Sequence, residues 1–196
     1  MLTPSWQLQD RVNHFFACLS CPLPIVTVAI STEDSAPATA QGVRFHTIPF
    51  GKIQISRKLL DLLTDDEVEF VLAHEVAHIY LNHLLGTGSF VVARALAEDA
   101  ARSDPEMKVL LAGWDLVKIL IFKGGNLPPD AALTKEQELA ADAWAVFLTG
   151  NKVAARTALL KLVGNTPDAP SHTWEVFDVP LPVMTIRERL AALDAR

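Results

Sequence analysis

Cysteine is scarce in this sequence: the 196 residues include only two, and both lie in Cys18-Leu19-Ser20-Cys21. One such pair is typical of redox motifs and of half a structural zinc site, but a structural zinc site needs four ligands and no second pair exists. We therefore expect Cys18 and Cys21 to be packing thiols. A chain of this length can bury a core without disulfides.

Basic residues are also few. The chain has 17 lysines and arginines against 23 aspartates and glutamates, a formal net charge of −6. A nucleic-acid binder needs a basic surface to neutralise phosphates, so nucleic acid is excluded as an expected partner. The 50% of hydrophobic residues indicates a soluble globular domain with a slight tendency toward membrane contact.

Long apolar runs are missing as well. Residues 1–10 lack the basic start and apolar stretch of a secretory signal, which predicts a cytoplasmic protein. Residues 107–122 are the most apolar later stretch, but charged residues interrupt it and it is shorter than the roughly 20 residues of a membrane span. We expect a helix there that is buried or rests on the cytoplasmic face of a membrane, so peripheral membrane contact is a predicted partner interaction.

The first third of the chain predicts a helix followed by a small sheet. Apolar spacing near the helical period indicates a helix over residues 6–19, and β-branched residues indicate a strand over 25–30. A loop is expected over 31–41, followed by strands over 43–48 and 52–56 with the turn at Pro49-Phe50-Gly51.

Two capping boxes mark the starts of later helices. Thr64 to Glu67 opens a helix expected to run through Leu84 until Gly86 and Gly88 end it, and Thr134 to Gln137 opens another that ends at Gly150. Further helices are expected over residues 90–101, 107–122, 152–162 and 183–193.

The first of these capped helices carries His74-Glu75-Val76-Ala77-His78. Residues four apart share a helical face, so His74 and His78 can offer two imidazoles to one zinc ion. Glu75 is then placed beside the open coordination position, where a carboxylate can take a proton from zinc-activated water. The pattern predicts one Zn²⁺ per chain, with Glu75 as the catalytic base.

A catalytic zinc needs a third protein ligand. Glu138 and Asp142 stand four apart on the second capped helix, without an obvious cationic partner at that spacing. We assign Glu138 to the metal and Asp142 to the spare ring N–H of His74 or His78. A solvated helix face is the alternative interpretation of this pair.

These motifs, together with residues 56–60 and 63–67, resemble the M48 family of gluzincin peptidases over roughly residues 40–150. The resemblance implies that Glu138 is the third zinc ligand and that Asp142 supports a zinc histidine. Family members also carry a Thr-His-Pro element and then an arginine before an Ile-x-x-Leu step. Here His172 lacks the following proline and Arg189 comes after a longer gap, and we assign both to stabilising an oxyanion.

Two other features lie near the motif. His83 falls one residue short of the third-histidine position of metzincins and is expected to be a neighbouring surface residue or a support for the ligands. Ile53, Gln54 and Ile55 alternate as an edge strand would, and such a strand could hold an extended peptide by backbone hydrogen bonds. An internal strand is the alternative.

The predicted fold is therefore α+β, helix-rich and zincin-like, with a small mixed sheet packed on the motif helix. Residues 1–196 are expected to form one metallopeptidase domain, with a core at about 40–150 and a helical C-terminal tail. The predicted function is zinc-dependent endopeptidase hydrolysis of peptide or protein substrates. The alternatives are a zinc-containing, chaperone-like binding module and a regulatory peptidase resembling the ImmA/IrrE group, which has asparagine where this chain has Asp142.

Overall fold

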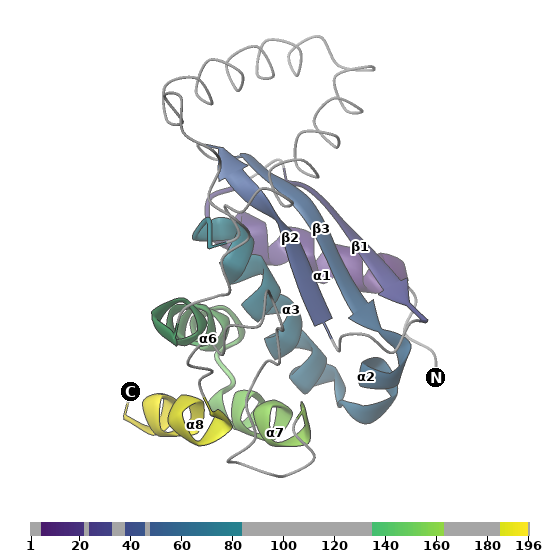
Figure 1. Cartoon of the computed structure of the whole chain (residues 1–196). Coiled ribbons are helices and arrows are strands. Elements are labelled where there is room, and N and C mark those ends of the chain that lie inside the picture. The colour runs from purple at the N-terminus through teal and green to yellow at the C-terminus, as the bar shows by residue number, and fades with distance from the viewer. Residues whose placement is uncertain are drawn as a thin grey trace, which may run out of the picture.

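The computed structural model describes residues 5–21, 24–32, 38–45, 48–83, 135–162 and 185–195. In these ranges helices pack against one small sheet (Figure 1), and the predicted helix-rich α+β class is confirmed. The helices are α1 (Ser5–Cys18), α2 (Arg57–Leu62), α3 (Asp65–Tyr80), α6 (Lys135–Thr149), α7 (Lys152–Leu162) and α8 (Ile186–Asp194). The strands are β1 (Ile25–Ser31), β2 (Ala38–Phe45) and β3 (Ile48–Ser56).

Strand β3 is the centre of the sheet. The strand order is β1-β3-β2, with β1 parallel and β2 antiparallel to β3. Ile53 pairs with Val28 on one side and with Ala40 on the other, and Ile53 and Ile55 are fully buried. The prediction that Ile53, Gln54 and Ile55 form an edge strand is therefore wrong, because both edges of β3 are already paired at these residues.

The hairpin between β2 and β3 lies earlier than predicted. Strand β2 begins at Ala38, inside the expected loop, and Pro49, Phe50 and Gly51 lie in β3 rather than in a turn. Proline is tolerated here because pairing with β1 begins only at Phe50, so the N–H that Pro49 lacks is not needed on that side.

A pair of glycines brings the sheet close to α3. Gly42 and Gly51 face each other across β2 and β3. A Cβ atom on Gly51 would lie 2.4 Å from the Gln41 carbonyl oxygen and 3.2 Å from Cδ1 of Ile79. The absence of side chains at this pair therefore lets α3 pack directly beneath β2 and β3.

Helix α1 covers the sheet beside β1. Its buried face consists of Leu8, Val12, Phe15 and Phe16. The Gln9 amide donates to the carbonyl oxygen of Val26 at 2.7 Å and accepts from the N–H of Val28 at 2.9 Å. This side chain pairs with the outer edge of β1 much as another strand would.

The C-terminal helices lie on the side of α3 away from the sheet (Figure 1), where α6 and α7 contact α3 and α8 contacts both. Helix α7 has the predicted bounds, whereas α8 starts at Ile186 behind a capping box of Thr185 and Glu188 that the sequence analysis missed. Thr134 and the helices expected over 90–101 and 107–122 lie outside the described residues. Among the described helices, none is long and apolar enough to cross a bilayer.

Candidate metal centre

Helix α3 is fixed at its start by the predicted capping box. The N–H of Glu67 donates to Thr64 Oγ1, and the N–H of Thr64 donates to Glu67 Oε2 at 2.7 Å. From Phe70 to Ile79 every residue of the helix is buried. Such a helix is enclosed on all sides, so the polar residues of the motif must find their partners inside the protein.

The helix ends earlier than the sequence predicted. It stops at Tyr80 with Leu81 as the C-cap, four residues before Leu84. Asn82 has a φ of 57°, which lies in the left-handed region. Glycine is the usual residue in this conformation and asparagine is also found there, and the conformation terminates the helix.

Three potential ligand atoms converge between α3 and α6. Nε2 of His74 lies 3.0 Å from Nε2 of His78. Nε2 of His74 lies 3.5 Å from Oε2 of Glu138, and Nε2 of His78 lies 3.5 Å from its other oxygen, Oε1. All three residues are buried. In a tetrahedral zinc site with bonds of about 2.0–2.2 Å, ligand atoms lie about 3.3–3.6 Å apart. Both histidine–carboxylate distances fall in this range and the distance between the two Nε2 atoms is slightly shorter, so the three side chains are close enough together to bind one zinc ion.

Asp142, one turn after Glu138, binds the other nitrogen of His74. Its Oδ1 lies 3.0 Å from Nδ1 of His74, and both groups are buried. An Nδ1–H that donates to Asp142 leaves Nε2 of His74 unprotonated toward Glu138 and His78. The proton is assigned by this hydrogen bond, which selects the tautomer that a metal requires.

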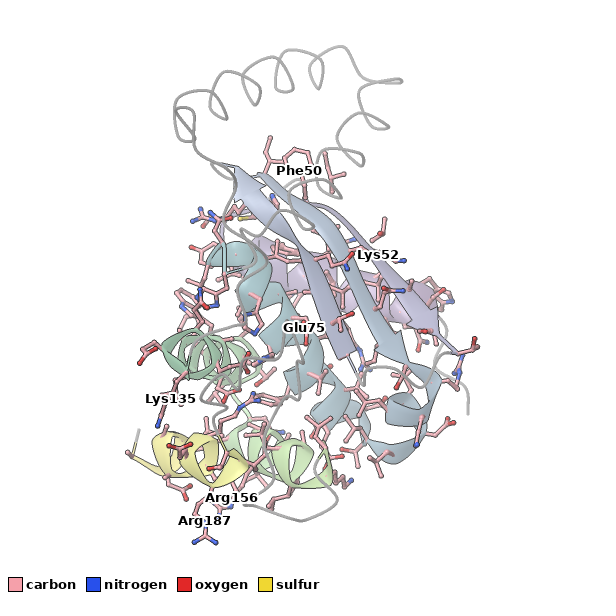
Figure 2. The ribbon with its side chains drawn as sticks, viewed as in Figure 1. Phe50, Lys52, Glu75, Lys135, Arg156 and Arg187 are labelled. Carbon is pink, nitrogen blue, oxygen red and sulfur yellow. The ribbon has the colours of Figure 1, made fainter. Side chains whose placement is uncertain are left out.

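Arg189 of α8 lies behind these carboxylates. Its Nε donates to Asp142 Oδ2 at 2.7 Å and its Nη2 donates to Asp142 Oδ1. Its Nη1 lies 3.2 Å from Glu138 Oε2. The side chain is only 4% exposed, whereas Arg187 points outward from the same helix (Figure 2). This geometry does not fit the predicted oxyanion donor, because the guanidinium is bound to the carboxylates that support the site.

The pKa values in the site reflect these contacts. Burial raises the pKa of Asp142, but the Arg189 guanidinium and the hydrogen bond from His74 outweigh it, so this pKa lies at about 2. Burial and the neighbouring His74 hold the pKa of His78 well below its ordinary value. Burial also lowers the pKa of His74. The hydrogen bond to Asp142 and the charge of Glu138 raise this pKa by more than burial lowers it, so the net shift is upward. Asp142 and Arg189 are thus an ionised pair.

The remaining predicted residues lie in different parts of the chain. Glu75 lies midway along α3 (Figure 2), the helix that contacts β2 and β3. His83 follows the helix end, and its Nδ1 lies 3.1 Å from Nδ1 of His78. His172 lies outside the described residues. Cys21 is buried and Cys18 exposed, and neither belongs to the cluster of metal-binding groups found among the described residues.

Comparison with known proteins agrees with this geometry. The profile of Peptidase family M48 matches residues 4–195. The chain is 29% identical over 170 residues to the Protease HtpX homolog of Sulfurovum sp. (strain NBC37-1), covering 79% of this chain and 59% of that protein. It is 30% identical over 149 residues to the Protease HtpX homolog of Campylobacter curvus (strain 525.92), covering 71% and 51%.

A third relative, the Protease HtpX homolog of Tropheryma whipplei (strain Twist), is 27% identical over 189 residues, covering 86% of this chain and 62% of that protein. The chain thus spans about half to three fifths of the length of these relatives. The family profile covers nearly the whole chain, and the cluster of His74, His78 and Glu138 is the one that the family resemblance implied. The chain belongs to peptidase family M48.

Proposed function

We propose that this chain hydrolyses peptide bonds with one zinc ion held by His74, His78 and Glu138. The observation that carries the proposal is the buried cluster of these three side chains. The two Nε2 atoms lie 3.0 Å apart, Nε2 of His74 lies 3.5 Å from Oε2 of Glu138, and Nε2 of His78 lies 3.5 Å from Oε1 of Glu138. Two imidazoles and one carboxylate are a donor set of catalytic zinc sites, which keep the fourth position open. Bound here, zinc would supply a Lewis acid that lowers the pKa of water toward ~7.

Glu75 acts as the general base and then as the general acid. It follows His74 directly on a rigid, buried helix, so its carboxylate is held beside the ligand face. It takes the proton of the attacking water and passes it to the leaving amine. Asp142 and Arg189 form a buried ion pair, and Arg189 also lies 3.2 Å from Glu138 Oε2.

The substrate pairs with the outer edge of β2. Gln9 occupies the outer edge of β1, and β3 is paired on both sides. Within the described part of the chain, β2 is thus the strand with one edge left for an extended peptide. It also contacts α3, the helix that carries Glu75.

The hydrogen bond of the Arg44 N–H shows which residues of β2 point their backbone groups to the outer edge of the sheet. This N–H donates to Asn82 Oδ1 at 2.5 Å, away from the β3 neighbour Pro49. Because alternate residues of an antiparallel strand point their backbone groups to the same side, Ala38 and Ala40 direct theirs to the outer edge. A peptide would pair at these two residues, and Asn82 limits the pairing at the Arg44 end.

The Glu75→Gln variant tests the catalytic assignment. Zinc-loaded wild type should cleave an unfolded, fluorescently labelled protein, and the variant should lose at least about 100-fold in kcat/KM, because a positioned base contributes at least that much. The variant should still bind one zinc per chain. Unchanged cleavage by Glu75→Gln would rule out Glu75 as the base, whereas capture of unfolded protein without cleavage by wild type would favour the chaperone-like alternative.

A further inference from the structure

The end of α3 is a Schellman motif built around a zinc ligand. The N–H of His83 donates to the carbonyl oxygen of His78 at 3.0 Å, and the N–H of Asn82 donates to that of Ile79 at 3.2 Å. With Leu81 as the C-cap, these are the two backbone bonds that define the motif. In this motif, the side chain of the residue that follows the left-handed residue normally packs against the side chain five positions earlier, in the last turn of the helix. Here those two side chains are His83 and His78.

The two rings meet edge to face. Their centroids are 5.2 Å apart at an interplanar angle of 68°, and Nδ1 of His83 lies 3.1 Å from Nδ1 of His78. The contact therefore involves the nitrogen of His78 that does not face His74 and Glu138. A motif that usually ends in an apolar contact here ends in a nitrogen–nitrogen hydrogen bond.

We propose that His83 is a positioning residue that fixes the tautomer and ring orientation of His78, and this inference rests on the zinc site proposed above. If Nε2 of His78 binds zinc, the ring proton is on Nδ1, so this nitrogen donates. Nδ1 of His83 accepts the bond, and the proton of His83 is then on Nε2. His83 thus serves His78 as Asp142 serves His74.

Asn82 explains why this arrangement is rigid. Glycine is the usual residue at a left-handed helix end, but Asn82 uses its carboxamide to accept the N–H of Arg44 from β2. The guanidinium of Arg44 also donates through Nε to the carbonyl oxygen of Tyr80 at 2.7 Å and lies over the Tyr80 ring. The helix end is therefore tied to the sheet by both residues, and His83 is held against His78.

Two variants separate positioning from packing. His83→Leu keeps an apolar contact of the usual Schellman kind but removes the acceptor, whereas His83→Asn offers Oδ1 near the position of Nδ1. The measurement is zinc affinity by chelator competition, with thermal unfolding of the metal-free chain as the control for folding. We expect His83→Leu to bind zinc about 10–100-fold more weakly, His83→Asn to recover most of that loss, and His14→Leu, which removes a histidine from α1, to match wild type.

Nitrogen NMR of the ¹⁵N-histidine-labelled, zinc-loaded wild type gives a second readout. We expect a protonated Nδ1 on His78 and an unprotonated Nδ1 on His83. Wild-type affinity in His83→Leu, equal losses in both His83 variants, or a protonated His83 Nδ1 would overturn the inference while leaving the zinc site intact. A wild-type chain that binds no zinc would instead overturn the proposed function together with this inference.

Discussion

At the scale of single residues, each ligand imidazole is held by a different kind of partner. Nδ1 of His74 binds a carboxylate that is itself bound by Arg189, and Nδ1 of His78 binds another imidazole. The charge on the His74 side is balanced by a buried ion pair, whereas in our proposal the partner of His78 is a neutral imidazole that accepts. The proposed metal site therefore depends on Arg189, which contacts both Asp142 and Glu138.

Replacing Arg189 should damage both folding and metal binding. Arg189→Met leaves Asp142 buried without its counter-ion, and breaking a buried pair in this way costs about 3–5 kcal/mol of unfolding free energy. Zinc affinity should fall by about 10-fold or more, because Glu138 and Asp142 lose the group that orients them. Chemical denaturation of the metal-free chain and chelator competition measure the two effects.

The surface pair of Arg156 and Asp194 is the matched control. It joins α7 to α8 at 2.6 Å, but its side chains are 47% and 55% exposed. Arg156→Met should therefore cost less than about 1 kcal/mol and leave zinc affinity unchanged. Equal effects of Arg156→Met and Arg189→Met would contradict the role given to Arg189.

Sequence patterns and the family resemblance predicted the cluster of His74, His78 and Glu138 and the contact of Asp142 with a ligand histidine, but not the contacts of Arg189 and His83. Helical spacing alone brings His74 and His78 to one face, and it likewise relates Glu138 to Asp142. The role of Arg189 could not be predicted, because it depends on how α8 packs 47 residues after Asp142. The contact of His83 depends on the left-handed φ of Asn82, for which an asparagine at a helix end was the available signal.

At the scale of elements, the start of α3 is linked to α7. Lys161 Nζ donates to Glu67 Oε2 at 2.7 Å, so the same carboxylate closes the capping box and forms an ion pair. Burial raises the pKa of Glu67, but the hydrogen bonds from Lys161 and Thr64 outweigh it, so the pKa lies below its ordinary value of 4.5. The carboxylate therefore stabilises the folded chain in its ionised form.

The stability that Glu67 contributes should depend on pH. A carboxyl group whose pKa is depressed by folding contributes fully above its unfolded pKa, and this contribution is lost as the pH falls through the folded pKa. At pH 7, Glu67→Gln should lower the unfolding free energy by about 1–3 kcal/mol, and the difference from wild type should shrink as the pH falls below the ordinary value of 4.5. Denaturation of wild type and Glu67→Gln at pH 7 and pH 3 measures this difference in unfolding free energy.

The same capping box in α8 gives the control. Glu188 closes it on the surface, where solvent screens its charge. Glu188→Gln should therefore change stability less than Glu67→Gln does. A difference between wild type and Glu67→Gln that stays constant between pH 7 and pH 3 would contradict the assigned role of the ionised carboxylate.

Removing the Gln9 side chain should expose the backbone groups at the outer edge of β1. Gln9→Leu removes both side-chain hydrogen bonds to β1 and should cost about 1–3 kcal/mol. The N–H of Val28 and the carbonyl of Val26 are then left for another chain, which favours self-association. Gln7→Leu adds the same leucine to an exposed position of α1 and should stay as wild type by denaturation and light scattering. Identical behaviour of the two variants would show that Gln9 does not guard this edge.

The order of the strands was one element-scale feature that the sequence did not predict. Alternation marked residues 53–55 as a strand, but alternation is the same whether one or both edges are paired. Pairing of β1 with β3 is parallel and bypasses β2, so β1 and β2 are neighbours in sequence but not in the sheet. Peptide binding therefore moves in our proposal from β3 to β2.

At the scale of the whole molecule, helices far apart in sequence meet at one point. Helix α3 supplies the motif, α6 supplies Glu138 and Asp142, and α8 supplies Arg189, so the proposed ligands and the residues that support them come together only when all three helices are packed. Family membership is established over nearly the full chain, and the fold class follows the sequence prediction. That residues 1–196 form a single domain stays a prediction.

The most direct test is the zinc content of the purified chain after dialysis against excess metal. We predict one zinc per chain in wild type and, with folding checked by circular dichroism, loss of the bound metal in both His78→Ala and Glu138→Ala. Stoichiometric zinc in Glu138→Ala, or none in folded wild type, would contradict a site made by two imidazoles of α3 and one carboxylate of α6.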